Sequence, residues 1–264
     1  MRRLVTLVAC LSAGPLWAGM PTFIANGGTN VNGNVGNCTP AMPGSILAND
    51  ILIAVACGEG DDDGVGIALT TANGFALVMG ETVGDDADAT EEDPELNCEV
   101  YWKRAVGADS APVFTDSGDH TSCSVHQFRG VKLTGNPWNV SVGSNDSNAN
   151  DTSAVIPGST TSAADCLVVL IQGTSNNGNS AANCGAVTNT DLATITEVFD
   201  GSITTGLGSG VCIITGEKAS AGAYGTSTLT MANTTYKSAY SLALEGAVAT
   251  GCGTTIPLTG AGCK

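Results

Sequence analysis

Acidic side chains gather in one stretch of this 264-residue chain, where their oxygens could hold a metal ion. Those between positions 59 and 95 are Glu59, Asp61, Asp62, Asp63, Glu81, Asp85, Asp86, Asp88, Glu91, Glu92, Asp93 and Glu95. Ca²⁺ takes about six to eight oxygen ligands, so the crowded group Glu59, Asp61, Asp62 and Asp63 is the candidate calcium site. The group lacks the alternating spacing of an EF-hand loop, and a solvated acidic loop is the alternative interpretation.

Two tryptophans could bind carbohydrate, because aromatic faces on a β-sandwich can stack on sugar rings. Trp102 stands in a β-like run beside Lys103 and Arg104, and Trp138 follows a proline. They are the candidate sugar-binding residues. The competing interpretation is a packing role, since a tryptophan buries a large apolar area.

Histidine chemistry is confined to His120 and His126, with Ser122 and Ser124 near them. A Ser/His/Asp arrangement could use these residues, but no G-x-S-x-G elbow surrounds them. In a strand, Ser124 and His126 share one face. Paired carboxylates, as in a glycosidase, are a second hydrolytic possibility. We therefore keep a hydrolase as the weakest of three functional hypotheses and predict no catalytic residue.

The chain carries ten cysteines but no C-x-x-C pair and almost no histidine, which excludes the usual zinc spacings. Disulfides are the better interpretation. The expected pairs are Cys98 with Cys123, Cys252 with Cys263, Cys38 with Cys57 and Cys184 with Cys212. Cys166 lies in a strongly apolar run and is expected to be a buried free thiol.

Residues 1–19 have the features of a secretory signal peptide. Arg2 and Arg3 precede a short apolar run that ends at Trp17, and Ala18 offers a cleavage point. A lipobox ending at Cys10 and a true start at Met20 are the alternatives. No later apolar segment reaches the length of a spanning helix. We expect a secreted, extracellular or virion-surface protein without a transmembrane segment.

The composition narrows the class of protein further. Hydrophobic residues make up 42% of the chain, which is too many for a disordered protein. The net charge of −16, with only nine Lys and Arg, argues against a nucleic-acid partner.

Six short segments recur in the same order at an offset near 115 residues. They predict two homologous halves, residues 20–133 and 134–248, followed by a Cys-closed tail at 249–264. Each half alternates β-prone runs with Gly/Asn/Asp/Ser clusters. The expected fold is all-β, with two jelly-roll-like or Ig-like sandwiches packed in tandem across a short linker.

Several strand-end and turn motifs resemble a poorly characterised family of duplicated β-sandwich proteins from phages, prophages and bacterial secretomes. These are residues 21–23, 48–52, 100–105, 116–120, 128–131, 135–138 and 222–225. The resemblance implies a virion-associated or surface structural role and transfers no catalytic residue. This chain differs from the family in its signal peptide and its many cysteines.

The resulting hypothesis is a non-enzymatic structural or adhesive protein that binds or assembles through loops and strand edges. Its expected partners are further copies of itself, as a homo-oligomer, or other surface or virion proteins, and glycans are a further possibility. No cofactor is expected, with calcium as the alternative. The second hypothesis is a carbohydrate-binding module.

Overall fold

The computed structural model describes residues 19–32, 36–60, 67–83, 95–115, 118–145, 151–175, 184–203 and 208–248. Every regular element in these ranges is a β-strand, so the predicted all-β class is confirmed. No helix in this described part is long and apolar enough to cross a membrane.

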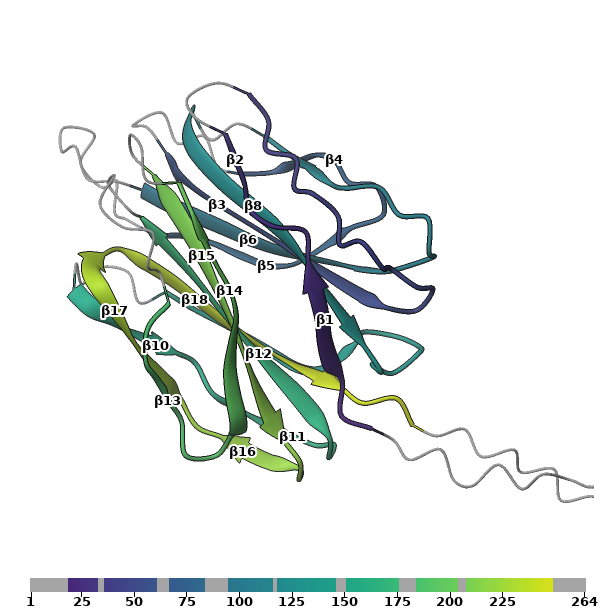
Figure 1. The fold of residues 1–264 in the computed structure, drawn as a ribbon. Helices are drawn as coiled ribbons and strands as arrows, with labels where there is room; N and C mark the ends of the chain where they lie inside the picture. The colour runs from purple at the N-terminus through teal and green to yellow at the C-terminus, as the bar shows by residue number, and fades with distance from the viewer. Residues whose placement is uncertain are drawn as a thin grey trace, which may run out of the picture.

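Residues of the first half form one antiparallel sheet (Figure 1). Its strands are β1 (Thr22–Asn26), β2 (Asn30–Asn32), β3 (Ile51–Gly60), β5 (Ala76–Val83), β6 (Glu95–Arg104) and β8 (Gly118–Arg129). The order across the sheet is β1-β8-β3-β6-β5, and β2 also pairs with β8.

The second half forms a large sheet in which equivalent strands follow one another in the same order as in the first. Its strands are β9 (Trp138–Asn145), β12 (Cys166–Ser175), β14 (Ala193–Ser202), β15 (Ser209–Lys218) and β18 (Lys237–Glu245). They are arranged β9-β18-β12-β15-β14. The correspondence supports two equivalent halves, and their common descent stays a prediction.

Shorter sheets cover the outer faces of the two large ones. They consist of β4 (Leu69–Thr71) with β7 (Val113–Phe114), β10 (Asp151–Ile156) with β17 (Ser227–Thr235) and β13 (Val187–Thr188), and β11 (Ser159–Thr161) with β16 (Gly222–Tyr224). In the second half the chain passes repeatedly between large and small sheets, and its first and last strands pair. This path is jelly-roll-like rather than Ig-like.

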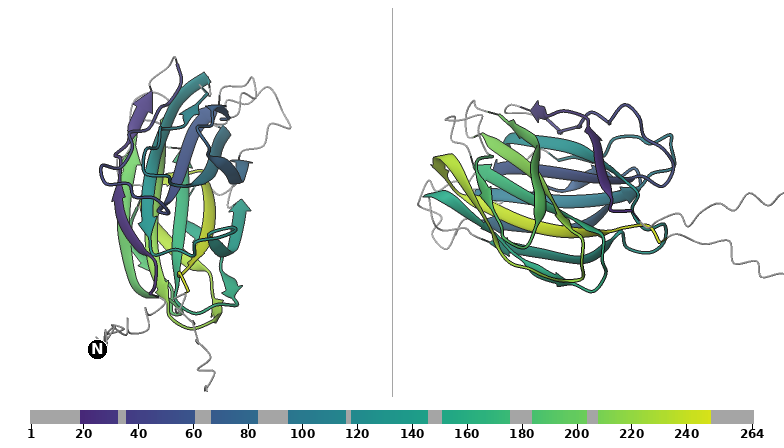
Figure 2. Two further views of the ribbon diagram at one scale, coloured as in Figure 1. Left: turned by 90° about the vertical axis from the view of Figure 1, so that its right-hand side faces the viewer. Right: turned by 60° about the horizontal axis from the view of Figure 1, so that its bottom comes forward.

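The inner faces of the two large sheets pack on one another and share a central core (Figure 2). Ile51, Ile53 and Val55 of β3 contribute to it from one side, and Leu167 and Val169 of β12 from the other. The alternate residues of both strands face separate outer cores. Both strands are therefore apolar at consecutive positions, because both of their faces are buried.

The core that each residue of β3 and β12 faces shows which positions of the two halves are equivalent. Asn49 and Asp165 both have positive φ, at 72° and 53°. Asp165 directly precedes β12, and one residue separates Asn49 from β3. This correspondence makes Ile51 equivalent to Leu167, an offset of 116. The sequence pattern had matched Ile51 to Cys166, and that alignment is wrong by one residue. A slip of one residue exchanges the two faces of a strand.

Three disulfides cross-link the described residues. Cys184–Cys212 is the pair expected from the sequence. The other two pairs are Cys38–Cys123 and Cys57–Cys98, so the expected Cys38–Cys57 and Cys98–Cys123 are wrong. Cys98 of β6 and Cys123 of β8 cannot pair, because β3 lies between these two strands.

The side chains of Cys98 and Cys123 also face different cores. Cys57 stands directly opposite Cys98, which explains their pairing. Cys166 is buried and free, and Cys252 and Cys263 lie outside the described residues.

Candidate functional site

Strand ends from both halves gather at one end of the double sandwich, at the upper left of Figure 1. There Gly60 of β3 lies opposite Glu95 of β6, and Ser175 of β12 lies opposite Ser209 of β15. The described residues on either side of the gaps at 61–66, 84–94, 146–150, 176–183 and 204–207 lie at this end, which we call the loop end. It is the candidate functional site.

Buried hydrogen bonds join the two halves close to the loop end. The Ser209 hydroxyl donates to the Cys57 carbonyl over 2.7 Å, and the Ser122 backbone N–H donates to Ser209 Oγ over 3.1 Å. The Tyr240 hydroxyl donates to the Cys98 carbonyl over 2.9 Å. Bonds between buried partners impose a geometry that apolar packing alone does not. The two sheets are thus held in a fixed relation at the loop end.

A buried lysine stands at the same end. Lys237, which has no exposed side-chain area, donates to Asp151 Oδ1 over 2.8 Å. This bond lowers the pKa of the half-exposed Asp151 carboxyl below its usual value. The pair holds the start of β10 against β18. Nothing in the sequence pattern had singled out either residue.

The opposite end of the molecule carries both ends of the described chain. Gly246, just after β18, lies so close to Gly19 that a Cβ on it would come within 2.6 Å of the Gly19 carbonyl oxygen. Val131 forms a bridge with Gly246. We call this end the terminal end, and it lies at the lower right of Figure 1.

A surface pocket of about 250 Å³ opens at the terminal end. Leu47, Val131 and Leu133 line it together with the ion pair of Asp50 and Arg129. Burial raises the pKa of the Asp50 carboxyl, but bonds from Arg129, the Leu47 N–H and Gln127 outweigh it and lower the pKa overall. Because Asp50 already engages the guanidinium through two oxygens at 2.8 Å, the pair serves to brace the strand ends.

The candidate calcium site lies mostly beyond what the structure describes. Asp61, Asp62 and Asp63 are outside the described residues, and for Glu59 only the backbone is placed, opposite Leu96. Calcium binding by these residues stays a prediction.

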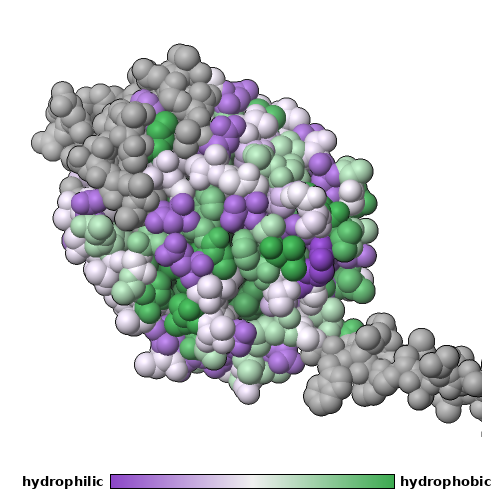
Figure 3. All heavy atoms as spheres, in the orientation of Figure 1, coloured by the Kyte–Doolittle hydropathy of each residue, from purple (hydrophilic) through white to green (hydrophobic). Residues whose placement is uncertain are grey.

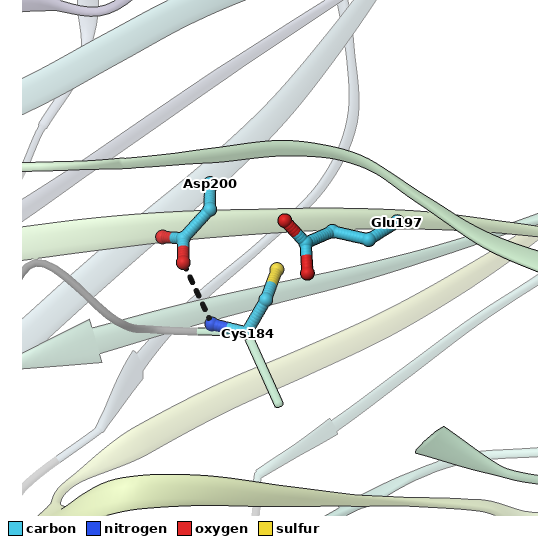
Figure 4. Close-up of side chains that lie close together, drawn as sticks. All are labelled: Cys184, Glu197 and Asp200. Atoms are coloured by element: carbon cyan, nitrogen blue, oxygen red, sulfur yellow. Dashed lines mark hydrogen bonds between the residues drawn. The ribbon is translucent and has the colours of Figure 1, made fainter. Parts of the chain in front are cut away.

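A second group, Cys184, Glu197 and Asp200, has the ligand types of a metal site (Figure 4). The Cys184 sulfur is bonded to Cys212, which removes the thiolate that a metal would need. One Asp200 oxygen already accepts the Cys184 N–H over 3.3 Å. The group therefore does not form a metal site while the disulfide is intact.

The two candidate sugar-binding tryptophans lie together, which the sequence had not indicated. Their rings meet edge to face, with centroids 5.4 Å apart. Trp102 comes from β6 and Trp138 from β9, and both are partly buried against the central core. This arrangement engages the rings in joining the two halves and favours the packing role over a sugar platform.

Ser124 and His126 do share a face of β8, and Ser124 Oγ lies 2.8 Å from His126 Nε2. Both side chains are completely buried, and the Phe199 ring packs against the imidazole at 4.8 Å between centroids. His126 Nδ1 has no hydrogen-bond partner among the described residues. Burial lowers the pKa of His126 to about 3, so the ring is neutral. A substrate cannot reach this pair in the folded protein.

No protein-family model, curated protein or solved structure matches the chain. The function must therefore be argued from the geometry of the chain itself.

Proposed function

We propose that this protein is a non-enzymatic structural or adhesive component of an extracellular or virion surface. The observation that carries the proposal is the division of the molecule into a loop end and a terminal end. The described residues that flank gaps in both halves lie at the loop end. The described chain enters and leaves at the terminal end.

The interior between these ends favours presentation over catalysis. Bonds such as Ser209 to Cys57 and a shared apolar core lock the two sheets together. Loops on such a rigid scaffold can contact a partner with little loss of conformational freedom in the framework. Three disulfides fit an oxidising, extracellular setting.

Fold-level analogy points the same way. Jelly rolls are common in capsid and lectin domains, although a fold by itself does not establish a function. The buried Ser124 and His126 offer no accessible nucleophile. The proposed activity is accordingly binding or assembly, with no reaction assigned.

Immunogold labelling of the organism that produces the chain tests the location. We expect gold particles on the cell surface, on an extracellular matrix or on virions. Labelling confined to the cytoplasm would overturn the proposal.

A loop replacement then tests which end makes the contact. Replacing residues 85–93 by Gly and Ser should abolish binding of the purified protein to the labelled surface while leaving its melting temperature unchanged. The matched control is Leu47→Ser, an exposed position in the terminal-end pocket. A loss of binding in the control alone would contradict the assignment of the loop end.

A further inference from the structure

We propose that the outer edge of β9 is a self-pairing interface, through which two copies of this chain join antiparallel about a twofold axis at Val142. The inference rests on the proposed function, since it names one edge and one partner for the assembly. It follows from a comparison of the four strands that end the two large sheets, β1, β5, β9 and β14.

Three of these four strands carry features that prevent edge-to-edge pairing. The first is β14, which departs from regular register at two places and contains Thr194 at a φ of 47°. It also carries Glu197 and Asp200, which would repel their counterparts in a second copy. Irregularities and charges are the usual protection of an exposed edge.

The other two protected strands lie on the first large sheet. In β5 the register shifts between Leu77 and Met79, and the strand carries Glu81. β1 spans only five residues, and its register shifts between Phe23 and Ala25. Neither strand offers a long, regular and uncharged edge.

β9 differs from these strands over most of its length. From Asn139 to Asn145 it contains no charged residue and no proline. Its pairing with β18 runs without a break from Val140 to Asn145, and the one irregularity lies at its start. Among the described residues no strand pairs with its other side, but the Asn139 side chain at its start already bonds to Ser162, just after β11. In a chain of net charge −16, an uncharged strand of this length is a place where two copies can approach.

The sequence of β9 is also close to self-complementary about Val142. Antiparallel pairing of two copies places Ser141 opposite Gly143, Val140 opposite Ser144 and Asn139 opposite Asn145. Every pair is uncharged and none combines two large side chains. A twofold axis requires such a match, because residue i of one copy meets residue j of the other and residue j meets residue i. This property identifies the partner as a second copy.

The overall charge sets the salt dependence of this interface. Each copy carries a net charge of −16, so the pairing acts against long-range repulsion. Added salt screens that repulsion. The dimer should therefore become stronger as ionic strength rises.

Sedimentation velocity of the full chain is the first test. We expect a concentration-dependent dimer that strengthens with salt. Gly143→Glu should weaken the dimer by at least about tenfold, because the two new carboxylates would lie diagonally across the joined strands. Gly143 is exposed, and a Cβ there would lie 3.4 Å from the Tyr240 ring, so the fold should tolerate the change.

The matched control is Thr196→Glu, at an exposed position of β14, which should leave the dimer intact. A wild-type chain that stays monomeric at high concentration and high salt overturns the proposal. So does a Gly143→Glu dimer of unchanged strength.

A cross-link tests the register. The twofold axis places residue 142 opposite itself, at a separation that suits a disulfide. Val142→Cys should therefore form a covalent dimer under mild oxidation, and Thr196→Cys should not. Absence of the Val142→Cys cross-link in a chain that dimerises would overturn the β9 assignment. A monomeric chain that still labels the surface would overturn this inference and leave the proposed function standing.

Discussion

The two halves of this protein share a strand order but differ at the place where they meet. Cys57 and Gly173 occupy equivalent positions on β3 and β12, and they contact one another across the central core. A Cβ on Gly173 would come within 2.0 Å of Cys98 Sγ and 2.5 Å of Cys57 Sγ. One half fills this space with a disulfide and the other leaves it open. At this point the two faces pack closely because Gly173 has no side chain where the other half carries the disulfide.

Two further pairs of equivalent positions show the same kind of asymmetry. His126 in the first half corresponds to Leu242 in the second, since they lie opposite Ile53 and Val169. Asp50 corresponds to Cys166, so an ion pair with Arg129 in one half is replaced by a buried thiol in the other. The surface on the β1 and β14 side mixes hydrophobic and hydrophilic residues over both halves (Figure 3).

The largest expected effect comes from filling the space at Gly173. Gly173→Ala should lower the free energy of unfolding by about 3 kcal/mol or more, because the disulfide behind it cannot move away. Urea denaturation measures the change. In a Cys57→Ala, Cys98→Ala background the same substitution should cost much less. An equal cost in both backgrounds would show that the disulfide is not the obstacle.

The next effect depends on pH. The folded pKa of His126 is about 3, below the unfolded value near 6.5, so the unfolded chain binds the proton more readily. Stability is therefore fully present above pH 6.5 and falls as the pH drops toward 3, by a few kcal/mol (~1.4 kcal/mol per pKa unit).

His126→Leu, which copies the residue at Leu242, should remove this part of the acid sensitivity. Thermal melts of both proteins between neutral and acidic pH measure it. Parallel curves for wild type and variant would contradict a buried neutral histidine.

The smallest expected effects come from the equivalent positions Asp50, which forms an ion pair with Arg129, and Cys166, which is a buried thiol. Asp50→Ala should cost about 2 kcal/mol, because it leaves the Gln127 amide and the Leu47 N–H without their charged acceptor. Cys166→Ala should cost about 1 kcal/mol, since it removes only a small apolar contact. Denaturant titrations at neutral pH give both values. A larger loss at Cys166 would reverse the comparison.

The thiol itself offers a chemical check on the same contrast. Burial, followed by the nearby Glu245 and Asp165 carboxylates, raises the pKa of Cys166 to about 11. The native protein should leave this thiol unlabelled by iodoacetamide at neutral pH, whereas denaturant should expose it. Rapid labelling of the folded chain at Cys166, located by mass spectrometry, would contradict its burial.

Sequence patterns predicted much of the fold because they report local preferences. The apolar runs at residues 51–56 and 166–171 indicated central strands buried on both faces, and that is where β3 and β12 lie. The Cys184–Cys212 pair and the free Cys166 also agree with expectation. Each of these predictions depended on a single segment or on two segments close in the chain.

The candidate sites were harder to predict, because their geometry depends on residues far apart in sequence. The contact between Trp102 and Trp138 requires β6 and β9 to meet across two sheets. The pairings of Cys57 and Cys123 depend on which strand lies between which. Lys237 and Asp151 meet over a separation of 86 residues, and no local pattern marks either of them.

By itself, the amino-acid sequence determined the all-β class, the abundance of disulfides and the segments that are apolar on both faces. Those properties follow from composition, from the number of cysteines and from unbroken apolar runs. The tertiary structure alone decided that the halves share one core, that Cys57 pairs with Cys98, and that Gly173 leaves room for their sulfurs. Close packing couples residues that are distant in the chain, and only their positions in space show which ones compete for the same volume.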